Sequence, residues 1–342
     1  MSPQRAQRAR RNLCVLCVLC GYITVKAFHR KGREEREETD QTFASFAFFA
    51  VTLRRTDLAF ALCLLVPVAL VLVVGLGLSF YLTRRHHLTE IHTPAEYGLE
   101  FEEVPLRTAD SLTLRGWWIP APNPERAVVI LHGHGGSMDG DVHRAPVFHQ
   151  AGFGVLLLDF RAHGRSPGRL ATFGYLERWD VLAAVEFLKG RGVRRIGLLG
   201  FSYGGMASML AAPICPDVHA VVTDGGPARL RSAIIGRGAE LGLPKWLTAF
   251  LAWWTIAITS ARLGVNLFRY EPVRWVGQIA PRPIFFIHGD LDPYCFDFDD
   301  LFAAAREPKE VWRLPEVGHT KASEVYPEEF YRRVVGFFDR YL

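Results

Sequence analysis

The sequence predicts an α/β fold, a mostly parallel eight-stranded sheet with helices on both faces, preceded by one transmembrane helix. From about residue 90 onward, short apolar runs of strand length alternate with stretches of helical periodicity, which is the pattern of a parallel sheet covered on both sides. Upstream of this region, 58–82 form one continuous apolar stretch. We therefore expect an N-terminal extension (1–57), a membrane helix (58–82) and one α/β domain (90–342).

The apolar stretch meets the physical requirements of a membrane span. No charged residue lies between Asp57 and Arg84, which leaves more than the roughly 20 apolar residues that are needed to cross a bilayer. The alternative is a buried core helix, but such a helix usually shows a polar face at helical spacing, and this stretch has none. The sequence thus predicts a single-pass membrane protein.

The basic residues that flank the span bear on its orientation. Arg54 and Arg55 on one side are balanced by Arg84 and Arg85 on the other, and nearby Lys and Arg residues mark the cytoplasmic side. The more distant basic residues before the span favour a cytoplasmic N-terminus. On this basis we expect the α/β domain to lie outside the cytoplasm.

The N-terminal extension contains two apolar runs, LCVLCVLCGYITV and FASFAFFAVTL, and neither is long enough to span a bilayer comfortably. We expect this extension to be poorly ordered. A further hypothesis is that residues 1 to about 50 do not belong to the native protein, because the sequence from Val51 reads like the start of a signal anchor. The CxxCxxC spacing of the first run lacks a nearby fourth ligand and does not predict a metal site.

The strands can be assigned in order along the domain. LEFEEV and LTLRGWWI predict an opening hairpin, and core strands are predicted at AVVILH, GVLLLDF, RIGLLGF, AVVTDG, PIFFIHG and EVWRLP. Intervening stretches such as YLERWDVLAAVEFLKG carry apolar residues at helical spacing.

The composition argues against several other classes of protein. The net charge of +5 is small for 342 residues, and the arginines form no basic stripe of the kind that binds nucleic acid. Only Cys215 and Cys295 lie in the α/β domain, so no disulfide framework is expected. The GFG around Gly152 lacks the rest of a dinucleotide-binding fingerprint, and we expect no cofactor.

The motif with the clearest chemistry is Gly200-Phe201-Ser202-Tyr203-Gly204, directly after the strand RIGLLG and before the helix-forming MASMLAA. This strand, turn and helix context is what a G-x-S-x-G nucleophile turn requires. The glycines permit a strained backbone at Ser202 that exposes its hydroxyl above the sheet edge. Ser202 is therefore the predicted nucleophile.

A serine nucleophile needs a base, and the base needs an acid to orient it. With this turn, the expected chain order is serine, acid, histidine. His319 in LPEVGHT follows the last strand and is the predicted base, the alternative being a capping or surface histidine. Asp292, which follows the strand PIFFIHG, is the predicted acid, and Asp290 and Asp224 remain alternatives.

The negative charge that develops on the substrate oxygen needs backbone donors. One is the amide after the nucleophile, at Tyr203, and the other is expected in the loop His132-Gly133-His134-Gly135-Gly136, at the amide of His134. A metal cluster of His132, His134 and His143 is the alternative, but flexible spacing and the absence of carboxylates in register argue against it. We expect no metal.

Five motifs, HGHGG, LLLDFRAHGRSPG, GLLGFSYGG, IHGDLDPY and EVGHT, occur in the order found in the alpha/beta-hydrolase superfamily, which 90–342 resembles. The stretch YEPVRWVGQIAPRPIFFIHGDLD is similar to membrane-anchored members known as lysophospholipase-like, thioesterase-like or serine-aminopeptidase-like hydrolases. The resemblance implies the triad and oxyanion hole in the positions Ser202, Asp292, His319, His134 and Tyr203. It also implies a structural loop beside the site, formed by Asp159, Arg161, His163, Gly164 and Ser166. One departure is Pro293-Tyr294-Cys295-Phe296, where many relatives carry a Val-Pro pair.

An insertion at about 227–280 interrupts the alternation of strands and helices where such hydrolases carry a lid. Its aromatic residues, Trp246, Phe250, Trp253 and Trp254, either contact acyl chains and membrane lipid or simply pack the lid onto the core. The sequence thus predicts a membrane-anchored serine hydrolase of acyl esters or thioesters. A serine peptidase with the same triad and a non-catalytic membrane scaffold on this fold are the alternatives.

Overall fold

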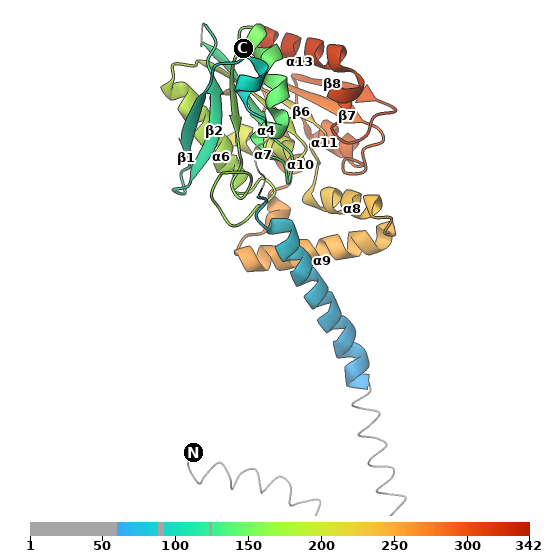
Figure 1. Ribbon diagram of the computed structural model, residues 1–342. Coiled ribbons are helices and arrows are strands. Elements are labelled where there is room, and N and C mark those ends of the chain that lie inside the picture. The colour runs from blue at the N-terminus through green and yellow to red at the C-terminus, as the bar shows by residue number, and fades with distance from the viewer. Residues whose placement is uncertain (1–59, 88–91, 123–124) are drawn as a thin grey trace, which may run out of the picture. The chain divides into compact units, whose positions relative to one another are not determined.

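The computed structural model describes residues 60–87, 92–122 and 125–342 (Figure 1). The prediction for the extension 1–57 lies outside the described residues. The chain divides into two compact units, Met1–Ala69 and Leu70–Leu342. This division falls within the helix Phe60–Thr83, so the C-terminal half of that helix belongs to the same unit as the sheet.

The second unit is built on one eight-stranded sheet with the order β1-β2-β4-β3-β5-β6-β7-β8. β1 and β2 form the predicted antiparallel hairpin, β2 pairs antiparallel with β4, and all other neighbours are parallel. This sheet confirms the predicted fold class. The strands are β1 (Glu102–Arg107), β2 (Thr113–Ile119), β3 (Arg126–Leu131), β4 (Gly154–Leu158), β5 (Arg195–Phe201), β6 (Val218–Asp224), β7 (Ile284–Gly289) and β8 (Lys309–Leu314).

Helices connect the parallel strands, as right-handed crossovers in such sheets require. The α-helices labelled in chain order are α4 (Met138–Asp141), α5 (Ala145–Gln150), α6 (Glu177–Gly190), α7 (Tyr203–Ala211), α8 (Leu230–Glu240), α9 (Lys245–Leu263), α10 (Pro272–Trp275), α11 (Phe298–Ala304), α12 (Ala322–Val325) and α13 (Pro327–Tyr341). Short 3-10 turns are η1 (Pro94–Tyr97), η2 (Val142–Arg144), η3 (Ala212–Ile214), η4 (Leu267–Arg269) and η5 (Val276–Gln278).

The core consists of two apolar layers, one on each face of the sheet. Along β3, Val129 and Leu131 face one layer while Val128 and Ile130 face the other, because successive strand side chains point to opposite faces. The first layer includes apolar residues of α6, α7 and α11, and the second includes those of α5 and α13. The sheet is therefore buried on both faces, which explains its continuous apolar strands.

The helix Phe60–Thr83 is, within the described part of the chain, the one helix long and apolar enough to cross a membrane. Its 24 residues extend about 36 Å at 1.5 Å per residue, against a hydrocarbon core of about 30 Å. Only 6% of its most apolar window is buried. A helix that is apolar all round and exposed in water is unfavourable, and a bilayer would cover it.

The predicted insertion contains α8 and α9, which Figure 1 shows below the sheet, away from the helices that cover its faces. Of the four aromatic residues singled out in the sequence, Trp246 is 74% exposed, Trp253 50% and Phe250 45%. These three side chains do not pack onto the core. The inner side of α9 does so through residues such as Ala252 and Ile256.

Candidate active site

Ser202 lies in a turn between the end of β5 and the start of α7, with φ 51° and ψ −109°. Such a positive φ is costly for a residue with a side chain. The turn closes because its flanking glycines have no Cβ: one added at Gly204 would lie 2.1 Å from the carbonyl oxygen of Leu131, and one at Gly200 would lie 2.5 Å from the backbone of Gly204. The local sequence therefore produces the strained turn that lifts the serine hydroxyl off the sheet.

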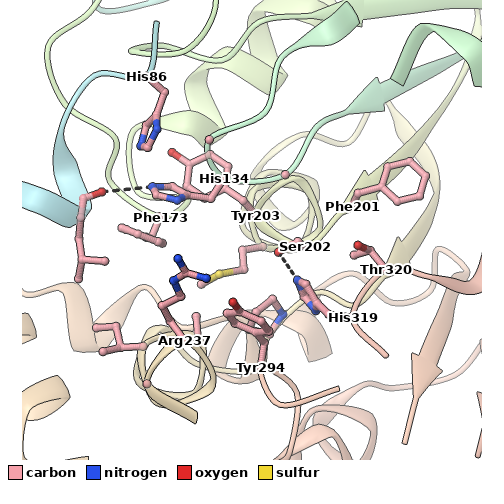
Figure 2. Close-up of a pocket in the computed structure, with 18 of the residues that line it drawn as sticks. His86, His134, Phe173, Phe201, Ser202, Tyr203, Arg237, Tyr294, His319 and Thr320 are labelled. Carbon is pink, nitrogen blue, oxygen red and sulfur yellow. Dashed lines mark hydrogen bonds between the residues drawn. The ribbon is translucent and has the colours of Figure 1, made fainter. Parts of the chain in front are cut away.

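His319 follows β8 and contacts Ser202 directly, as Figure 2 shows. The distance between its Nε2 and Ser202 Oγ is 2.7 Å, and its Nδ1 lies 2.7 Å from Asp292 Oδ2. A carboxylate can only accept, so Nδ1 carries the hydrogen and donates it to Asp292. This leaves the Nε2 lone pair to accept the hydrogen of the serine hydroxyl, which is the arrangement needed for a general base.

Asp292 is held rigidly behind His319 in the loop after β7. Its side chain is fully buried, its Oδ1 accepts the amide hydrogen of Tyr294 at 2.8 Å, and its own amide donates to the carbonyl of Gly289 at 3.0 Å. The structure thus brings together the three residues predicted from the sequence as nucleophile, acid and base.

The two alternative acids occupy other positions. Asp290 is exposed and lies 3.6 Å from Nε2 of His288. Asp224 is buried at the end of β6, and burial raises the pKa of its carboxyl to about 7. Its carbonyl oxygen accepts the amide hydrogen of Ser202 at 2.9 Å, so Asp224 supports the nucleophile turn through its main chain.

The two predicted oxyanion donors, the amides of Tyr203 and His134, belong to segments that line the same cavity as Ser202. Tyr203 is the first residue of α7, so its amide has no partner within the helix. The loop after β3 lies against the nucleophile, since a Cβ added at Gly133 would be 3.7 Å from Ser202 Cβ. The neighbouring His134 fixes this loop through its side chain, whose Nε2 donates to the carbonyl of Leu82 at 3.2 Å.

The loop that the resemblance marks as structural supports the oxyanion loop from behind. Asp159 is fully buried, and its Oδ1 accepts the amide hydrogen of Met138 at 2.9 Å. Ser166 donates its hydroxyl to the carbonyl of Asp159 at 2.6 Å, while Arg161 is held between two carboxylates, from Asp110 and Asp180. The start of α4 is thereby tied to the loop after β4.

Three histidines beside this loop form a group that we call the histidine cluster: His86, His134 and His163. One ring nitrogen from each lies within 4.8 Å of the others. Desolvation lowers the pKa of His134 to about 4 and that of His163 to about 2, so both are neutral at pH 7, the form that binds metals. The alternative metal cluster of His132, His134 and His143 is not formed, because His143 is exposed and His132 is not among the three histidines of the cluster.

Tyr294 is a site residue for which the sequence predicts no role. Its ring centroid lies 4.4 Å from that of His319, and its hydroxyl donates to Glu240 of α8. The signal was present as the departure from the Val-Pro pair at 293–296. The loop that carries the acid is thus connected to the first helix of the insertion.

A cavity of about 870 Å³ opens over Ser202 and His319. Figure 2 shows His134 and Phe173 on one side of it and Arg237 and Tyr294 on the other. The cavity lies at the carboxyl ends of β5, β7 and β8, where open α/β sheets bind their ligands.

Comparison with known proteins agrees with this geometry. Residues 128–333 match the alpha/beta hydrolase family. The chain belongs to that family. This alpha/beta hydrolase is 28% identical over 243 residues to the uncharacterized protein YfhR of Salmonella typhimurium, covering 67% of this chain and 77% of YfhR.

Two further similarities involve hydrolases with a named activity. The structure of the Pyrococcus furiosus esterase Pf2001 is 26% identical with a TM-score of 0.63, covering 76% of this alpha/beta hydrolase and 98% of the esterase. The thiohydrolase apmlB of Arthrinium phaeospermum is 33% identical over 127 residues, which are 35% of this chain and 41% of apmlB. Together with the family match, the esterase structure supports an enzyme of the hydrolase type.

Proposed function

We propose that this chain is a membrane-anchored serine hydrolase that cleaves the carboxylic ester or thioester of an acylated substrate. One observation carries the proposal: the imidazole of His319 is hydrogen-bonded at 2.7 Å both to Ser202 Oγ and to the buried carboxylate of Asp292. The proposal is supported by the strained turn at Ser202, which leaves the hydroxyl facing a cavity.

In the acylation step, Ser202 Oγ attacks the acyl carbon and His319 Nε2 takes the hydroxyl proton. The amides of Tyr203 and His134 donate to the oxygen that becomes negative, and one such donor contributes about 10²–10³ in kcat. When the bond to the leaving oxygen or sulfur breaks, His319 returns the proton to that atom. The acyl group is then an ester of Ser202.

Deacylation repeats these steps with water as the nucleophile. His319 takes a proton from the water, hydroxide adds to the acyl carbon, and the proton returns to Ser202 Oγ as the carboxylic acid leaves. Asp292 accepts the Nδ1 hydrogen of His319 throughout and stabilises the imidazolium. Neither step requires a cofactor.

The choice of an ester or thioester is supported by two similar proteins, one named an esterase and one a thiohydrolase. The anchor in this proposal is the helix Phe60–Thr83, and the basic residues before it favour a hydrolase domain outside the cytoplasm. The insertion between β6 and β7 serves as the lid of the acyl site.

Fluorophosphonate labelling of the full chain in detergent tests the proposal. We expect wild-type protein to be labelled and to hydrolyse p-nitrophenyl acetate, and Ser202→Ala to lose both. Esterase activity that survives in Ser202→Ala would contradict the serine mechanism. A panel of acyl esters, thioesters and peptides then separates the proposed activity from a peptidase, and a wild type inert to all of them and to the label would indicate a scaffold.

A further inference from the structure

The cavity over Ser202 extends between two apolar walls. One wall is the last part of the helix Phe60–Thr83, through Leu78, Tyr81 and Leu82. The opposite wall comes from the insertion, through Ile234 of α8, Leu241 directly after α8 and Leu251 of α9. All six residues belong to the unit Leu70–Leu342. The same helix that is long enough to span a membrane therefore also contributes side chains to the active-site cavity.

The two walls are joined by buried polar contacts. Ser79 and Thr83, one turn apart, are 0% and 1% exposed. Thr259 of α9 donates its hydroxyl to Ser79 Oγ at 2.8 Å, and Arg262 Nε donates to the same oxygen at 3.0 Å. Arg262 also donates to Thr83 Oγ1. Hydrogen bonds of this kind have preferred geometry, so they fix α9 at one position against the end of the helix.

Side-chain packing adds to the same junction one turn earlier. A Cβ added at Gly75 would lie 2.5 Å from Cδ1 of Ile258, so the glycine leaves room for the end of that side chain from α9. This is the use that membrane helices make of small residues at their contacts. The space between the walls is therefore defined by the fold and is not a gap between loosely placed elements.

The wall near the nucleophile is tied to the catalytic loop. The carbonyl of Leu82 accepts from His134 Nε2 at 3.2 Å, and the amide of His86 donates to the carbonyl of Ala162 at 2.7 Å. A group bound along Leu78 and Leu82 would thus lie beside the oxyanion loop. Its reacting end would face Ser202, and its remainder would contact the apolar side chains of the two walls, with Arg237 of α8 beside them.

We propose that the space between the end of the helix Phe60–Thr83 and α8–α9 is an acyl-chain subsite, which selects the medium or long acyl chain of a membrane lipid. The inference rests on the proposed function, because it needs an acyl group bound at Ser202. An aliphatic chain is the ligand that apolar walls favour, with about 0.8 kcal/mol per buried methylene. We assign the acyl chain to a lipid because the earlier turns of the same helix are apolar and exposed, so the anchor of the proposed function would hold the cavity beside the bilayer.

The test compares p-nitrophenyl decanoate with p-nitrophenyl acetate, using the full chain at one fixed detergent concentration. Leu78→Trp and Leu251→Trp fill the subsite from its two walls. Leu76→Trp is the matched control, since Leu76 lies on the same helix, is 43% exposed and does not line the cavity. The measured quantity is the decanoate-to-acetate ratio of kcat/KM, which does not depend on the fraction of folded enzyme.

Wild type is expected to prefer decanoate. Leu78→Trp and Leu251→Trp should each lower the ratio by about fourfold for every methylene that the subsite no longer covers, while Leu76→Trp keeps the wild-type ratio. A wild type without chain preference, unchanged ratios in both cavity variants, or an equal fall in Leu76→Trp would overturn the subsite. Acetate hydrolysis that persists in Ser202→Ala would instead refute the proposed function, so the two failures are distinguishable.

Discussion

Replacing Asp292 by asparagine tests the catalytic arrangement with little change in shape. Both carboxylate oxygens accept, Oδ1 from the amide of Tyr294 at 2.8 Å and Oδ2 from His319 Nδ1 at 2.7 Å. Asparagine offers one acceptor and one donor. With its oxygen kept on Tyr294, its amino group faces His319 Nδ1, which must then accept, and the hydrogen moves to Nε2. An imidazole in this tautomer cannot take the proton of Ser202, so kcat should fall by about 10³–10⁴.

The opposite orientation of the asparagine does not rescue the site, because it turns the amino group toward the amide hydrogen of Tyr294. The assay is kcat/KM for p-nitrophenyl acetate, together with the rate of fluorophosphonate labelling. Asp290→Asn and Asp224→Asn are the matched controls and should retain most of the activity. Asp292→Asn with more than a tenth of wild-type activity, or an equal loss in Asp224→Asn, would refute the assignment of the acid.

Three further predictions concern groups around the triad. Burial raises the pKa of Asp224 to about 7, so between about pH 4 and pH 7 the folded protein binds a proton that the unfolded chain releases, and stability falls as the pH rises through this window. Asp224→Asn should therefore raise Tm by at least about 2–4 °C at pH 8 and by less at pH 5. Equal increases in Tm at the two pH values would contradict burial of a titrating carboxyl as the reason. His134→Phe keeps a ring but removes the hydrogen bond to Leu82, and we expect kcat to fall by up to about tenfold with KM little changed. A kcat equal to that of the wild type would show that this hydrogen bond does not position the oxyanion loop. Dialysis against a chelator should leave ester hydrolysis intact, because the triad chemistry needs no metal, and a loss restored by Zn²⁺ would assign a role to the histidine cluster.

The sheet could be predicted because its strands are buried on both faces. Runs such as RIGLLGF and PIFFIHG are apolar without interruption, and they coincide with β5 and β7 to within a residue. The edge strand was placed less well: LEFEEV covers 99–104, whereas β1 is Glu102–Arg107 and includes Pro105. An edge strand tolerates proline and exposed charge, so its periodicity is weak and its limits follow from pairing with β2.

The triad could be predicted because each member follows a strand, and parallel strands bring their carboxyl ends to one edge of the sheet. The roles of Tyr294 and of the His134 side chain could not be obtained in this way. Tyr294 acts through a ring contact with His319 and a hydrogen bond to Glu240, which lies 54 residues away in the chain. Contacts of this kind depend on how segments far apart in the chain fold against each other, and the spacing of residues within one segment does not predict them.

The end of the apolar helix shows the limit of hydropathy most clearly. Ser79 and Thr83 are four residues apart and so lie on one face of the helix, a pattern that the length criterion for a membrane span ignores. Hydroxyl groups facing hydrocarbon would lack partners, which is unfavourable, and here Thr259 and Arg262 satisfy them. The last turn of the helix therefore belongs to the enzyme rather than to the lipid. Removing the helix Phe60–Thr83 would leave Arg262 without these oxygens and open one wall of the cavity, so we expect truncation of this helix to abolish the activity of the remaining domain.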